Sequence, residues 1–231
     1  MTIELYDLAG ADPAVRFSPF CWRTRMALAH KGLAVECRPW SFTEKSKIAF
    51  SDQGRVPVLR DGGHVVSDSW AIARDLETRY PDRPSLFGGA GGEAHAHFVN
   101  SWADTVLQPG IARLIIADVW SCLAEHDKAY FRTSREDRFG AKLETIQSTR
   151  DADAIAFRRS LQPLRTTLAT QAYLGGPTAS YADYIVFGGF QCTRATSGFE
   201  LLEASDAVAL WRERMLDLFD GLARTAPRAV R

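Results

Sequence analysis

Apolar and polar residues alternate in short blocks over the first third of the chain, and these blocks predict strands and helices in turn. Short apolar-rich segments bounded by turn residues predict four strands, at residues 2–8, 33–40, 56–60 and 64–66. Helical spacing predicts one helix from Ser18 to Gly32 and a second from Asp68 to Pro81, while residues 41–54 read as irregular with one or two helical turns. The order β-α-β followed by β-β-α predicts a mixed four-stranded sheet with one parallel unit and one hairpin.

The pattern changes after a segment rich in Gly and Pro, residues 84–92, which reads as a linker. From there on the chain has helical periodicity and no convincing strand, which predicts an α/β domain at 1–83 and an all-helical domain at 93–231. The expected helices of the second domain are 93–107, 110–126, 134–149, 153–171, 180–193 and 206–225.

One helix start in the second domain carries a readable cap. Ser180 and Asp183 stand three residues apart just before an apolar helix, which is the spacing of a capping box with Asp in the place of the usual Glu or Gln. We interpret this pair as a folding signal and not as a site of chemistry.

Composition and charge narrow the class of protein. The 231 residues carry 28 basic and 28 acidic side chains, and this balance argues against general binding of nucleic acids or membrane surfaces. The four cysteines are scattered without metal-ligand spacing, and His64, His95 and His97 have no visible third ligand, so no metal site is predicted. No secretory signal or membrane span is visible, and we expect a cytoplasmic protein with reduced thiols.

Three short segments of the first domain could bind an anionic peptide. Ser18 opens a helix, where unpaired backbone N–H groups and the positive end of the dipole favour an anion. Pro57 opens a strand beside an irregular stretch, where a cis bond would free the backbone of Val56 to pair with an extended peptide. Asp68 and Ser69 open the next helix and could hold an ammonium and a carboxylate. Each segment alone reads more simply as a helix cap or an edge proline; the set of three in one β-α-β-β-α frame favours a site.

These residues carry a resemblance that covers nearly the whole chain. The first domain resembles the thioredoxin-like N-terminal domain of the glutathione transferase superfamily, and the second resembles its helical domain. Within the superfamily, the strings S-P-F-C-W-R-T-R-M-A-L-A-H-K-G, V-P-V-L and S-D-S-W are most similar to glutathione-dependent β-etherases of lignin breakdown and their fungal relatives. The maleylacetoacetate isomerase class also resembles the chain around S-x-x-x-W-R-x-R, less closely.

The resemblance implies a role for each matching residue. Ser18 would donate a hydrogen bond to the glutathione sulfur, Val56 before a cis Pro57 would pair with the cysteinyl part, and Asp68 with Ser69 would hold the γ-glutamyl end. The family usually has Glu or Gln where this chain has the shorter Asp68.

The remaining parts of the expected site are less well marked by the sequence. No motif fixes the anchor of the glycine carboxylate, for which the candidates are Lys45, Gln53 and Arg55. Phe20 and Trp102 are expected to border an apolar substrate, although aromatic residues at such positions more often belong to a core.

The expected function is attack by a Ser18-stabilised glutathione thiolate on an apolar, aromatic electrophile. The most specific hypothesis is the cleavage of β-aryl ethers. Glutathione is then a cosubstrate, no metal takes part, and the resemblance implies a homodimer. Two alternatives stay open: a glutathione-dependent isomerase of the maleylacetoacetate type, which needs cations to hold its substrate, and a non-catalytic ligand-binding or regulatory protein of the same fold.

Overall fold

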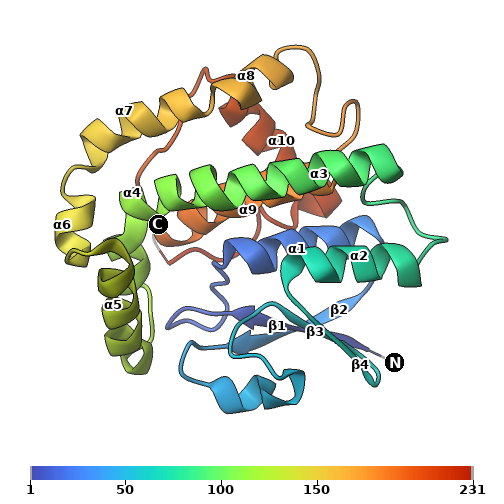
Figure 1. Ribbon diagram of the computed structural model, residues 1–231, viewed down its shortest axis with the longest axis horizontal. Coiled ribbons are helices and arrows are strands. Elements are labelled where there is room, and N and C mark those ends of the chain that lie inside the picture. The colour runs from blue at the N-terminus through green and yellow to red at the C-terminus, as the bar shows by residue number, and fades with distance from the viewer. Residues whose placement is uncertain (1, 230–231) are drawn as a thin grey trace.

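The computed structural model describes residues 2–229 and has an α/β half followed by a helical half (Figure 1). The sheet has the order β2-β1-β3-β4, with the strands β1 (Ile3–Leu8), β2 (Val35–Trp40), β3 (Val58–Asp61) and β4 (His64–Ser67). β1 and β2 are parallel, and β3 is antiparallel to both β1 and β4. The predicted mixed four-stranded, thioredoxin-like sheet is therefore confirmed.

One strand begins later than the sequence suggested. β3 starts at Val58, whereas the apolar run suggested residue 56. The peptide bond between Val56 and Pro57 is cis, so the backbone there does not follow the ladder, and Val58 is the first residue of the strand to pair with Tyr6.

Helices α1 (Pro19–His30) and α2 (Ser69–Arg79) cover the face of the sheet that is turned toward the helical half (Figure 1). Ser18 caps α1, and Gly32 follows it with a φ of +64°, a left-handed conformation that favours glycine at a helix end. The short 3₁₀ segment η1 (Lys45–Ser51) occupies the stretch that the sequence left irregular.

The helical half differs from the expected helices in several places. Its elements are α3 (Ala90–Trp102), the π-helical η2 (Ala103–Leu107), α4 (Gln108–Ser121), α5 (Glu125–Phe139), α6 (Leu143–Gln147), α7 (Arg150–Ser160), α8 (Gln162–Leu168), α9 (Tyr181–Thr196) and α10 (Ala207–Gly221). The predicted domain boundaries at residues 83 and 92 stay predictions.

Three of these differences can be traced to particular residues. The predicted break before residue 110 is wrong, because α3, η2 and α4 run on without interruption; a wider π-helical turn precedes Pro109, whose ring would clash with a regular helix. The predicted helix at 134–149 is also wrong. Gly140, with a φ of +70°, ends α5 there, and α6 is a separate helix. The predicted helix at 153–171 is in fact two helices, α7 and α8, which meet at Leu161.

The capping box of α9 is confirmed, and its acid has further partners. Asp183 is fully buried and accepts the backbone N–H of Ser180 at 2.9 Å. It also accepts the backbone N–H groups of Leu174 and Gly175 and the indole N–H of Trp211 on α10. One carboxylate therefore joins the start of α9 to the preceding loop and to α10.

Helix α9 is the main contact between the two halves. It packs along α1, and at Gly188 the backbones come so close that a Cβ would lie 2.3 Å from the carbonyl oxygen of Pro19. Because Pro19 follows Ser18 directly, the small Gly188 sets how near α9 lies to the start of α1.

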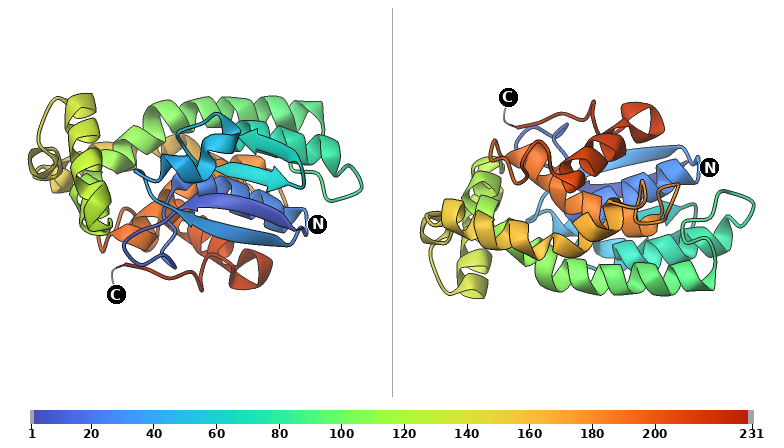
Figure 2. Two further views of the ribbon diagram at one scale, coloured as in Figure 1. Left: turned by 90° about the horizontal axis from the view of Figure 1, so that it is seen from below. Right: turned by 90° about the horizontal axis from the view of Figure 1, so that it is seen from above.

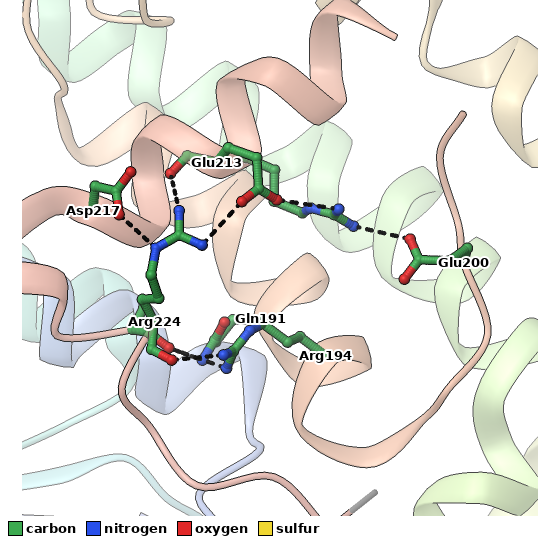
Figure 3. A network of polar contacts seen from close by, with 8 residues as sticks. Gln191, Arg194, Glu200, Glu213, Asp217 and Arg224 are labelled. Carbon is green, nitrogen blue, oxygen red and sulfur yellow. Dashed lines mark hydrogen bonds and ion pairs between the residues drawn. The ribbon is translucent and has the colours of Figure 1, made fainter. Parts of the chain in front are cut away.

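The segment after α10 is held by arginines (Figure 3). Arg224 pairs with Glu213 and Asp217 on α10, and Arg194 and Gln191 on α9 donate to backbone carbonyls of residues 223 and 224. These contacts fasten residues 223 and 224 to α9. No helix between residues 2 and 229 is long and apolar enough to cross a membrane.

Candidate functional site

The sheet topology brings the three predicted binding segments to one edge. β1 and β2 are parallel, so Leu8 and Trp40 pair at their carboxyl ends, and the loop after β1 leads to Ser18. β3 runs the opposite way, and its first residue, Val58, pairs with both Tyr6 and Ser67 near the same end. One edge of the sheet therefore carries four parts of the candidate site: Ser18, the segment after β2, the start of β3 and the start of α2. This edge faces the end of the molecule where α5 stands (Figure 2).

Ser18 is 4% exposed and caps α1. Its Oγ accepts the backbone N–H of Cys21 at 3.2 Å, so the oxygen serves the helix. Among residues 2–229 the only neighbouring group found to interact with the Ser18 side chain besides this N–H is the Cys21 thiol, which is a weak acceptor, so Ser18 can donate to a ligand while its oxygen remains in the cap.

The cysteines of the chain are poor nucleophiles. Burial, and then the negative charge of Asp7, raise the pKa of the Cys21 thiol. Burial likewise raises the pKa of Cys37, that of Cys122 to about 11 and that of Cys192 to about 12. Because the thiolate is the reactive form, these shifts disfavour each of the four thiols as a nucleophile.

The predicted cis bond before Pro57 is confirmed, and the backbone beside it is available. The N–H and C=O of Val56 form no hydrogen bond with any other described residue. Two such unpaired backbone groups at a sheet edge are what an extended peptide needs for antiparallel pairing. The residues present therefore fit the cysteinyl part of glutathione.

Asp68 and Ser69 open α2 as expected, and both also have structural duties. Asp68 has a φ of +78°, and its Oδ1 accepts the N–H groups of Trp70 and Ala71. Ser69 is 2% exposed, and its carbonyl oxygen accepts the hydroxyl of Tyr181 at 2.5 Å. The cap leaves the other oxygen of Asp68 without a hydrogen bond in the described chain, so that oxygen can face a ligand ammonium.

Residues of the helical half also reach this edge, and reasoning from the sequence missed them. Asp127 on α5 accepts the backbone N–H groups of Phe42 and Thr43, just after β2. Farther along α5, the guanidinium of Arg135 lies 5.2 Å from the ring centre of Phe42. The spacing of Arg135 from Phe131 along α5 could have placed both residues on one helix face. Only the fold shows that this face meets the sheet edge.

The candidates for the glycine-carboxylate anchor lie nearby. Arg55 is exposed and close enough to Arg135 that its charge lowers the pKa of Arg135. The ammonium of Lys45 lies 5.4 Å from the ring centre of Tyr130 on α5, and Gln53 is exposed. The geometry brings these side chains to the edge and does not choose among them.

The two aromatic candidates are placed differently. Phe20 is 36% exposed in the first turn of α1, and the guanidinium of Arg23 stacks 4.5 Å from its ring centre. Arg23 in turn pairs with Asp104 of η2 at 2.7 Å, which fixes Phe20 relative to the helical half. Trp102 ends α3 and packs half-buried against the core, and no described contact joins it to Ser18 or Phe20.

A metal has no evident place in the described chain. Over residues 2–229, no three His, Cys, Asp or Glu side chains are arranged to hold an ion. The groups present at the edge are hydrogen-bond donors and a helix start, which act on a bound anion.

Comparisons with known proteins point the same way. The family model "Glutathione S-transferase, N-terminal domain" matches residues 17–79, and "Glutathione S-transferase, C-terminal domain" matches residues 94–223. Glutathione S-transferase 4 of Zea mays is 27% identical over 214 residues, 87% of each chain.

Solved structures are similar over nearly the whole chain. The glutathione transferase GSTFuA3 of Phanerochaete chrysosporium is 28% identical with a TM-score of 0.78, covering 96% of this chain and 92% of its own. A glutathione S-transferase of Ceriporiopsis subvermispora, solved in complex with glutathione, is 23% identical with a TM-score of 0.81 and covers 98% and 99%. Together with the two family models, which span both halves, these matches show that the chain belongs to the glutathione S-transferase family.

Proposed function

We propose that this glutathione transferase uses Ser18 to stabilise the glutathione thiolate, which then attacks an apolar, aromatic electrophile. The observation that carries this proposal is the buried Ser18 hydroxyl at the start of α1, whose oxygen caps the helix and which has only the weakly accepting Cys21 thiol as a further partner, at the edge where the backbone of Val56 is also unpaired. The thiol would lose its proton to solvent, and the sulfur would form the new bond to carbon while the leaving group takes the electron pair.

The hydrogen bond from Ser18 and the start of α1 can together lower the pKa of the glutathione thiol far enough for catalysis. A free thiol with a pKa of about 8.5 is roughly 3% ionised at pH 7, and a lowering by about two units ionises about three quarters of it. This shift requires about 2.7 kcal/mol. One hydrogen bond to a charged group contributes about 1.5–3 kcal/mol, and the start of a helix about 0.3–1 kcal/mol.

The residues proposed to bind glutathione are Val56, Pro57, Asp68, Ser69 and Arg55. Val56 would pair with the cysteinyl backbone, and the start of α2 would hold the γ-glutamyl group, as the free backbone and the free Asp68 oxygen support. Arg55 would meet the glycine carboxylate. Phe20, exposed beside Ser18, and Trp102 are proposed to border the electrophile.

Within this function, the substrate class we favour is a β-aryl ether next to a ketone. The thiolate would attack the carbon that carries the ether oxygen, and a phenolate would leave. The resemblance of residues 18–32 to β-etherases motivates this substrate, as does the similarity of the fold to fungal glutathione transferases. If α-keto β-aryl ethers stay unchanged with enzyme and glutathione while general electrophiles are conjugated, this substrate class is excluded.

The first experiment follows the ultraviolet thiolate absorbance of bound glutathione across pH. We expect the bound thiol to ionise well below 8.5, and Ser18→Ala to raise its pKa by about 1–2 units, the equivalent of one charged hydrogen bond. Ser18→Thr, which keeps a hydroxyl, should preserve the low pKa, and Ser101→Ala, on the exposed side of α3, is the matched control. An unchanged thiol pKa in Ser18→Ala would exclude Ser18 as its stabiliser, and the absence of any glutathione signal would favour the non-catalytic alternative.

We also propose a cytoplasmic homodimer, as is common in the superfamily. Sedimentation of the purified protein would test the oligomeric state, with a mass twice the 25.6 kDa of the chain expected.

A further inference from the structure

Four basic side chains gather where α5 meets the sheet edge, and none has an acidic partner. They are Lys45, Arg55, Arg135 and Arg138, called here the α5-edge cations. Throughout residues 2–229, no carboxylate forms an ion pair with any of them, although the surface of this protein is otherwise rich in such pairs.

Arg135 is the centre of this group. It is half-buried, with its guanidinium 4.5 Å from the ring centre of Phe131 and 5.2 Å from that of Phe42. Its one hydrogen bond within the described chain is to the hydroxyl of Ser134, the preceding residue. Burial and the positive charges of Arg138 and Arg55 lower its pKa to about 10, so it stays charged at neutral pH.

Four of the acids near α5 are committed elsewhere, and the exposed Asp137 of α5 pairs with none of the α5-edge cations. Asp127 accepts backbone N–H groups of Phe42 and Thr43, and Glu136 and Glu144 both pair with Arg132. Glu44 pairs with Lys47. No ion pair within the described protein therefore compensates the positive charge of Arg135.

A purely structural role does not account for this arrangement. Packing between α5 and Phe42 could be made by Leu or Met, without the cost of removing a guanidinium from water beside other cations. The stacked rings instead hold the guanidinium in one place at the edge that carries Ser18, which is how a cation is prepared for a planar anion. A bound carboxylate would offset both the burial and the repulsion.

We propose that Arg135, supported by Arg138, binds a carboxylate of the electrophilic second substrate, so that this transferase acts on aromatic acids. This inference rests on the proposed glutathione transferase function and adds to it the charge of the electrophile. Phe42 and Tyr130, whose rings lie 6.0 Å apart, would pack against the aromatic part of such a substrate.

Two electrophiles that differ only in one negative charge test whether the substrate carboxylate is recognised. In 4-chloro-3,5-dinitrobenzoate the glutathione sulfur forms a bond to the ring carbon that bears chlorine, and chloride leaves with the bonding electrons; no oxidant or reductant is needed. The methyl ester of the same compound reacts in the same way and differs only by the lost negative charge. The two glutathione conjugates are stable ligands, so their binding can be measured without turnover.

The test is calorimetric titration of the purified protein with three ligands: glutathione, the carboxylate conjugate and the ester conjugate. We expect the carboxylate conjugate to bind about 10-fold more tightly than the ester conjugate, as one charged hydrogen bond provides. Arg135→Gln should abolish this preference and leave the affinity for glutathione and the ester conjugate within about 2-fold of wild type. Arg135→Lys, which keeps the charge, should retain most of it.

A second variant guards against a folding defect in Arg135→Gln. Arg138→Glu leaves the stacked guanidinium in place and supplies it with an acid one turn along the same face of α5. This variant should also reduce the preference for the carboxylate conjugate and leave the affinities for glutathione and the ester conjugate unchanged. Its unfolding transition, followed by circular dichroism, should match that of the wild type.

Three results would overturn the inference. Equal affinity of the wild-type protein for both conjugates would mean that no substrate carboxylate is recognised. Equal weakening of all three ligands in Arg135→Gln would assign the cluster to the glycine carboxylate of glutathione instead. If glutathione and both conjugates fail to bind at all, the proposed transferase function fails as well, whereas binding of glutathione with equal conjugates leaves that function standing.

Discussion

The replacement of Asp183 by Ala should be among the most destabilising single changes in this protein. The carboxylate is fully buried and accepts four N–H groups, those of Leu174, Gly175 and Ser180 and the indole of Trp211, at 2.7 to 3.0 Å. Alanine would leave these donors without a partner in the interior, where each unsatisfied group costs about 1–3 kcal/mol.

The net effect is smaller than four separate bonds would suggest. Burial raises the pKa of Asp183, which means that dehydration of the carboxylate offsets part of what the donors contribute. We therefore expect Asp183→Ala to lower the free energy of unfolding by about 3–5 kcal/mol, against the roughly 5–15 kcal/mol typical of native proteins. Asp183→Asn keeps the shape and one accepting oxygen, and should cost about half as much.

The assay is urea unfolding followed by far-ultraviolet circular dichroism at one protein concentration, because Trp211 lies against the mutated residue and would disturb a fluorescence signal. Asp151→Ala, at an exposed acid of α7, is the matched control and should change stability by less than about 0.5 kcal/mol. A loss below about 1 kcal/mol in Asp183→Ala would refute the reasoning, since the four donors would then have found other partners.

Two further changes test how α9 supports the glutathione site. Tyr181→Phe removes the hydroxyl that donates to the carbonyl of Ser69, and should weaken glutathione binding about 2- to 10-fold in calorimetry, whereas Tyr184→Phe should not. Gly188→Ala places a methyl group 2.3 Å from the Pro19 carbonyl, and should cost about 1–3 kcal/mol in unfolding and weaken glutathione binding; Gly198→Ala, with open space around it, is the control, and equal effects of the two would contradict the close-approach argument.

The sequence predicted those parts of the site that depend on local chain geometry. A Ser followed by Pro, with Gly fourteen residues after the Ser, specifies a capped helix whatever surrounds it, and α1 begins and ends there. The same holds for the cap of α9 at Ser180 and for the start of α2 at Asp68. The predicted helices wrongly ran through Gly140, which ends α5, and wrongly broke near Pro109; both errors stayed local, because helix ends depend on a few neighbouring residues.

The long-range part was decided by the tertiary structure. Nothing in the spacing between Phe42 and Arg135 shows that they touch, because that contact depends on how α5 packs against the carboxyl end of β2. The same is true of Tyr181 with Ser69 and of Gly188 with Pro19, which are joined only when α9 docks on α1.

By itself, then, the sequence determined the order of strands and helices in the first half and the caps that open α1, α2 and α9, since caps, turns and periodicity act between near neighbours. Only the tertiary structure decided which cations stand at the sheet edge without an ion-pair partner. Charges from distant segments are balanced or left unbalanced by packing, and packing is set by the shapes of whole helix faces that no local pattern records.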